Sequence, residues 1–136
     1  MLLSSRRAIA EAIGTGGLVA TVVGSGIMAT RLTQDVALQL LVNALATVAA
    51  LAVLIWALGP ISGAHFNPVV TLVAVVRREI GAAEAARYVL AQIVGGLAGT
   101  AIGNVMFGLP AWQASAKVRS SPSLWLGEVI ATAGLL

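Results

Sequence analysis

The sequence predicts an all-α integral membrane protein, a bundle of membrane-spanning helices with one half-length helix inserted among them. The first observation is composition, because only 10% of the 136 residues are charged and 59% are hydrophobic. A soluble domain carries about 25% charged residues, and the mean hydropathy here is +0.98. The second observation is a series of long apolar stretches. The third is a short polar segment, residues 62–70, that interrupts them.

Three apolar stretches are each long enough to cross a hydrocarbon core of about 30 Å as a helix: residues 8–29, 36–58 and 85–107. The first could also be read as a cleaved signal peptide. It contains Glu11, however, and further spans of the same kind follow it, which favours a true span. A fourth stretch begins near Leu124 and reaches the last residue after about 13 positions, too few to cross.

A half-length helix is predicted after the polar segment. Asn67 is a good N-cap, and Pro68 fits the first helical turn, where its missing N–H costs nothing. The apolar run ends at about Val76, before Arg77 and Arg78. A helix of about 10 residues is roughly 15 Å long, half the thickness of the hydrocarbon core. The segment is therefore expected to enter the membrane and return to the same side.

The distribution of basic residues predicts the orientation. With a cytoplasmic N-terminus, five basic residues lie inside the cell and three outside. The inner ones are Arg6, Arg7, Arg77, Arg78 and Arg87, and the outer ones are Arg31, Lys117 and Arg119. We therefore expect a multi-pass protein of the cell membrane with its N-terminus in the cytoplasm. Residues 108–123 read as an exposed connecting loop.

An internal repeat is indicated by two matching segments, residues 11–18 and 128–135, which share Glu, Ile, Thr, Gly and Leu at equivalent places. Three spans separate the copies, so the second would enter the membrane from the opposite side, as in many transport proteins. Residues 1–123 are predicted to form the first repeat with its connecting loop. Residues 124–136 are predicted to begin a truncated second repeat, and the chain is expected to be a fragment of a longer protein.

Composition argues against several other functions. The chain has no cysteine, and its single histidine and five carboxylates are scattered along the sequence. No catalytic triad, metal cluster or cofactor site is therefore expected. Nucleic acid is not expected either, because the net charge is only +3 and the basic residues lie in membrane loops. The sequence predicts neither an enzyme nor a metal protein.

The polar segment has the chemistry of a pore wall. Irregular backbone at membrane depth is tolerated where it lines a water-filled path, and we expect the carbonyls of residues 59–66 to lack helical partners. They would accept hydrogen bonds from a permeating molecule, and Asn67 would donate. The positive end of the half-helix would repel cations. The alternative is a re-entrant loop that only packs, as a plug or scaffold.

Residues 62–71 resemble the first signature loop of the aquaporin and glycerol-facilitator family, the major intrinsic proteins. The resemblance implies six spans and two half-helices whose Asn-Pro motifs meet at mid-membrane. It implies passive conduction of a small neutral solute such as water, glycerol, urea or a metalloid acid like arsenite, and a homotetramer in the lipid bilayer. Asn67 would then be the pore asparagine, and the carbonyls of Gly63, Ala64 and His65 would line the cytoplasmic vestibule.

Two departures from the family pattern bear on selectivity. The motif residue after Pro68 is usually alanine and here is Val69, which would shift the contact between half-helices. The resemblance also places Thr47, twenty positions before Asn67, in the selectivity filter, where many members have a bulky aromatic residue. A small threonine implies a wider filter, suited to glycerol, urea or arsenite-like solutes. The family's second Asn-Pro motif and filter arginine are not in this sequence.

Other polar residues are expected to support the pore. By resemblance, Glu11 and Glu128 accept hydrogen bonds from loop amides, although a buried carboxylate could instead relay protons. Gln92 is expected to hold the loop rather than touch solute. His65 reads either as a fixed part of the pore wall or as a pH gate.

Glycines and tryptophans are given structural roles. Gly95, Gly99 and Gly103 recur every fourth residue and predict a close-packing seam. The three tryptophans are expected at the membrane interfaces: Trp56, Trp112 and Trp125.

Two rival functions remain. One is a non-conducting membrane fragment with a scaffold or interaction role. The other is an ion-coupled transporter, which should place a carboxylate near the helix break, and none lies beside Asn67.

Overall fold

The chain is all-helical in a computed structural model that describes residues 2–114 and 120–134. Lys117 and Arg119, two of the predicted outer basic residues, lie outside the described residues. The five helices are α1 (Leu2–Leu32), α2 (Val36–Ser62), α3 (Pro68–Val76), α4 (Ala82–Met106) and α5 (Pro122–Ala133). In the described part, α1, α2 and α4 are long and apolar enough to cross a membrane, which confirms the predicted all-α membrane bundle.

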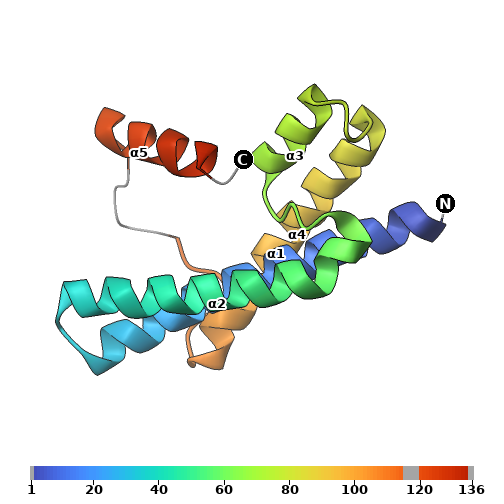
Figure 1. Cartoon of the computed structure of the whole chain (residues 1–136). Coiled ribbons are helices and arrows are strands. Elements are labelled where there is room, and N and C mark those ends of the chain that lie inside the picture. Colours follow the sequence, from blue (N-terminus) through green and yellow to red (C-terminus); the bar gives the residue numbers. More distant parts are fainter. Residues whose placement is uncertain (1, 115–119, 135–136) are drawn as a thin grey trace.

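Helix α1 forms the centre of the bundle, because it packs along both α2 and α4 (Figure 1). The contact with α4 is very close. A Cβ added to Gly95 would overlap the carbonyl of Ala12, and one added to Gly99 would overlap the carbonyl of Gly16. Gly103 lies against Val23 in the same row. The predicted glycine seam is therefore present, and it lets the two backbones approach without intervening side chains.

The end of α2 differs from the prediction. The helix continues past residue 58 and through Pro60 to Ser62, and the Gly63 N–H donates to the Gly59 carbonyl at 2.9 Å. Gly63 has φ 90°, a left-handed conformation that glycine adopts readily at a helix C-terminus. The expectation that every carbonyl of residues 59–66 lacks a helical partner was therefore wrong, and the irregular backbone is confined to residues 63–67.

The short helix α3 matches its predicted bounds. Asn67 has extended backbone angles and caps the helix, Pro68 occupies the first turn, and the helix ends at Val76. Arg78, just beyond it, has φ 60° and reverses the chain. Helix α3 packs against α4 and lies beside it in Figure 1. Its 9 residues give about 14 Å of length, so it reaches only part of the way across a bilayer.

Helix α5 stands apart from the three spans (Figure 1). It begins at Pro122, two residues before the predicted start, because the Ser121 hydroxyl caps it by accepting from the Leu124 amide at 3.3 Å.

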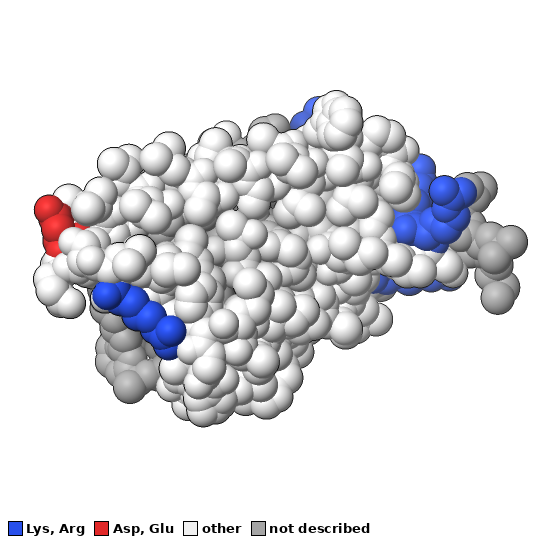
Figure 2. Space-filling view, turned by 90° about the horizontal axis from the view of Figure 1, so that it is seen from below, with Lys and Arg blue, Asp and Glu red and all other residues white. Residues whose placement is uncertain are grey.

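Surface charge follows a membrane-protein pattern. On the face shown in Figure 2, a broad uncharged surface lies between charged groups at the two ends of the molecule, and one further basic group is visible at the upper edge. Trp56, Trp112 and Trp125 are 83%, 64% and 60% exposed.

Candidate functional site: a re-entrant loop held by a buried carboxylate

Glu11 lies at the centre of the site and is fully buried. Its Oε1 accepts hydrogen bonds from the Ser62 hydroxyl at 2.6 Å and the His65 amide at 3.0 Å. Its Oε2 accepts from the Phe66 amide at 2.7 Å and from Gln92 Nε2 at 2.8 Å. Four donors from α2, the loop and α4 thus converge on one carboxylate of α1. They replace the hydration that a charge loses inside a membrane protein.

The loop backbone is strained, and its contacts hold it in that state. Ala64 and Phe66 have φ of 52° and 48°, values that cost non-glycine residues free energy. The Ala64 amide donates to Ser62 Oγ at 3.1 Å, next to the two amide bonds to Glu11. The Phe66 ring, 5% exposed, lies so close to Gly14 of α1 that a Cβ there would overlap it. The loop therefore has one well-defined shape.

A second group of hydrogen bonds ties the loop to α3. Gln92 Nε2 also donates to Thr71 Oγ1 at 3.0 Å, and that hydroxyl donates to the Asn67 carbonyl at 3.1 Å. Thr71 is fully buried and Gln92 is 2% exposed. Gln92 thus connects Glu11 with the first turn of α3 and sets the position of Asn67.

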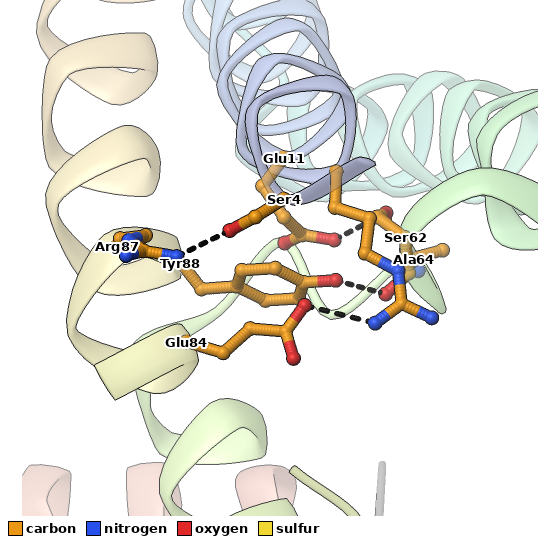
Figure 3. Close-up of polar contacts among 8 residues, drawn as sticks. Ser4, Glu11, Ser62, Ala64, Glu84, Arg87 and Tyr88 are labelled. Carbon is orange, nitrogen blue, oxygen red and sulfur yellow. Dashed lines mark hydrogen bonds and ion pairs between the residues drawn. The ribbon is translucent and has the colours of Figure 1, made fainter. Parts of the chain in front are cut away.

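Tyr88 holds the end of α2 and was not singled out from the sequence. Its hydroxyl donates to the Ser62 carbonyl at 2.7 Å (Figure 3). The residue as a whole is 1% exposed. The ring meets His65 edge-on with centroids 5.2 Å apart. One signal was available, because Tyr88 lies one helical turn before Gln92 and so shares its face of α4.

His65 contacts two buried side chains. Its Nδ1 lies 3.1 Å from the Thr71 hydroxyl, and the ring is half-buried against Tyr88.

The open side of the loop carries unpaired polar groups. Among the described residues, no donor bonds the carbonyl oxygens of Gly63, Ala64 or His65. Asn67 Oδ1 accepts from the Val69 amide at 2.8 Å, which leaves the Nδ2 group without a hydrogen-bond partner in the described part of the chain. Three free carbonyl acceptors are therefore followed by one free NH₂ group. Pro68 and Val69 are exposed beside them.

Two predicted site residues are not joined to this network. Thr47 is half-buried and its hydroxyl donates to the Asn43 carbonyl of its own helix at 2.8 Å. It lies about 22 Å along α2 from Ser62, at 1.5 Å per residue. Glu128 is exposed on α5 and shares an open groove of about 600 Å³ with Asn67 and Val69. It makes no hydrogen bond to a loop amide within the described ranges, unlike Glu11.

No group of three His, Cys, Asp or Glu side chains that could hold a metal ion occurs among the described residues.

Comparison with known proteins agrees with the fold. Residues 2–135 match the family model described as major intrinsic protein. The chain is 53% identical over 132 residues to aquaglyceroporin AqpS of Rhizobium meliloti (strain 1021), covering 97% of this chain and 57% of that protein. It is 39% identical over 92 residues to aquaporin A of Dictyostelium discoideum, covering 68% of this chain and 33% of that protein. Human aquaporin-5 is 48% identical over 59 residues, which are 43% of this chain and 22% of that protein.

The chain spans little more than half of the length of AqpS and a smaller share of the other two relatives. The match nevertheless covers nearly all of this chain, including the loop, Glu11 and Gln92. The chain therefore belongs to the major intrinsic protein family, whose members are multi-pass membrane channels rather than enzymes.

Proposed function

We propose that this chain forms one half of a passive channel for small neutral polar solutes. The observation that carries the proposal is the loop at residues 63–67, where three free carbonyls precede the free amide of Asn67. A solute with hydroxyl or amide groups could exchange its bonds to water for bonds to this row. Each bond is of ordinary strength, so binding is weak enough to permit exit.

Cations would be disfavoured for two reasons. The N-terminus of α3 begins at Asn67, and the positive end of its dipole repels cations. The Glu11 charge is buried behind the loop, where four hydrogen-bond donors satisfy it. It is therefore not available as a cation ligand. This supports a channel over an ion-coupled transporter.

The preferred solute is proposed to be glycerol, urea or a metalloid acid such as arsenite, in addition to water. By family resemblance Thr47 takes the filter position, and a small residue there would leave room for solutes larger than water. The similarity to a protein named an aquaglyceroporin points the same way. The other pore wall would come from a second half with its own half-helix, and the full channel is proposed to be a homotetramer.

The cellular setting is part of the proposal. We place the protein in the cell membrane with its N-terminus in the cytoplasm, so that the loop enters from the cytoplasmic side. Support comes from the basic residues at the N-terminus and around residue 77.

Solute flux tests the proposal directly. Purified protein that contains both halves of the channel, placed in liposomes, should accelerate volume changes in glycerol and urea gradients, followed by stopped-flow light scattering. Asn67→Asp keeps the capping oxygen but removes both amide donors, and flux should fall at least tenfold. Gln34→Glu adds the same charge at an exposed site and should leave flux unchanged. Flux equal to that of empty liposomes would instead favour a non-conducting scaffold.

A further inference from the structure

Arginines lie near the start of α1, directly after α3 and near the start of α4. Two of them are ion-paired, Arg7 with Glu84 at 2.8 Å and Arg77 with Glu79 at 2.9 Å. Arg87 donates to the Ser4 hydroxyl at 2.6 Å (Figure 3). Arg6 is exposed and has no ion-pair or hydrogen-bond partner among the described residues. This end of the bundle therefore has positive charge that its own carboxylates do not neutralise.

A small cavity lies beside the unpaired arginine. It is bounded by Arg6 and Arg7 of α1 and by Pro60 and Ile61 of α2, and its volume is about 150 Å³. A cavity of that size can hold a group as large as benzene. Guanidinium groups at its wall suit the planar, bidentate recognition of a phosphate group.

Apolar surface continues from this cavity along both helices. Ile9 and Ile13 follow Arg6 at the third and seventh positions, on the same face of α1, and are 58% and 59% exposed. On α2, Trp56 lies one turn before Pro60 and is 83% exposed. Tryptophan prefers the headgroup level of a membrane. The cavity beside Arg6 and Arg7 is therefore a groove that continues into an apolar surface suited to hydrocarbon chains.

We propose that the groove bounded by Arg6, Arg7, Pro60 and Ile61 binds the phosphate headgroup of an anionic phospholipid. The acyl chains would lie along Ile9, Ile13 and Trp56. A free phosphate ion would use only the arginines, whereas a lipid also covers the adjoining apolar side chains. Basic grooves between membrane helices bind lipid headgroups in this way. The site uses residues of α1 and α2 only and does not depend on the channel proposal.

Quenching of Trp56 by brominated lipids tests the site. Trp112→Phe and Trp125→Phe leave Trp56 as the only tryptophan, and the protein is placed in bilayers containing brominated phosphatidylglycerol or brominated phosphatidylcholine. We expect stronger quenching by phosphatidylglycerol at equal mole fraction. Arg6→Gln should lower that preference about fivefold, the effect of one arginine near a lipid surface.

Two controls separate the lipid site from simpler explanations. Arg77→Gln removes the same charge from an arginine away from the groove and should keep the preference. Inorganic phosphate at millimolar concentration should not reduce quenching. An equal loss with Arg77→Gln would show a diffuse charge effect and overturn the proposal. Displacement by inorganic phosphate would also overturn it, by showing an ion site without a lipid.

Discussion

Gln92 Nε2 of α4 donates a 2.8 Å hydrogen bond to Glu11 Oε2 of α1, directly behind the re-entrant loop. Neither side chain touches the open face of the loop, yet both determine its shape. Glu11 receives the loop amides, and Gln92 joins it to Thr71 on α3. The polar core of this membrane protein thus serves to present the carbonyls of residues 63–65 and the amide of Asn67.

Replacing Glu11 should release the loop. In Glu11→Gln one oxygen becomes an NH₂ group that faces existing donors, so at least one buried donor loses its acceptor. We expect a loss of about 3 kcal/mol and faster hydrogen exchange at the His65 and Phe66 amides, measured by mass spectrometry in detergent. Glu79→Gln, at an exposed ion pair, is the control. Unchanged exchange at both loop amides would contradict the bracing role of Glu11.

The position of the Phe66 ring should require a glycine at position 14. A methyl group at Gly14 would overlap the Phe66 ring, so Gly14→Ala should displace the loop and cost about 1 to 3 kcal/mol. Gly17→Ala is the matched control, since its Cβ would lie 3.6 Å from Leu54 in ordinary contact. Glycerol flux in liposomes should fall in Gly14→Ala only, and Phe66→Leu in the same chain should restore part of it. Equal flux in the two alanine variants would count against this contact.

Alanine substitutions at two neighbouring glycines of α4 should differ in their effect on stability. Gly99→Ala places a Cβ against the Gly16 carbonyl, which forces α1 and α4 apart, whereas Gly96→Ala meets Thr15 Cγ2 at 3.8 Å. We expect Gly99→Ala to lower the melting temperature in detergent by several degrees, in line with a loss of about 1 to 3 kcal/mol. Gly96→Ala should melt near the unmodified protein. Similar melting of both variants would refute close backbone contact at Gly99.

Tyr88 should stabilise the end of α2 through its hydroxyl. Tyr88→Phe keeps the ring against His65 but leaves the buried Ser62 carbonyl without its donor. The expected cost is about 1 to 3 kcal/mol, with faster exchange at the Gly63 and Ala64 amides. Trp56→Phe changes an exposed aromatic residue and should alter neither quantity. A Tyr88→Phe variant with normal exchange would show that the bond to Ser62 is dispensable.

The fold was largely predictable because its signals are local. Span length and hydrophobicity identify α1, α2 and α4, and the Asn67–Pro68 pair marks the start of α3. The end of α2 was misjudged because Gly59 and Pro60 resemble helix breakers. Pro60 continues the helix here, since proline can be accommodated in membrane helices where neighbouring groups satisfy the freed backbone.

The sequence by itself determined the membrane class, the half-length of α3 and the family, since each depends on hydrophobic length or a contiguous motif. Only the tertiary structure decided which donors Glu11 receives, that Gly14 accommodates Phe66, and that Tyr88 closes the end of α2. Those contacts join residues tens of positions apart, and they depend on how closely α1 and α4 approach. The glycine spacing that permits this approach is visible in the sequence. How closely the two backbones approach is seen only in the packed structure.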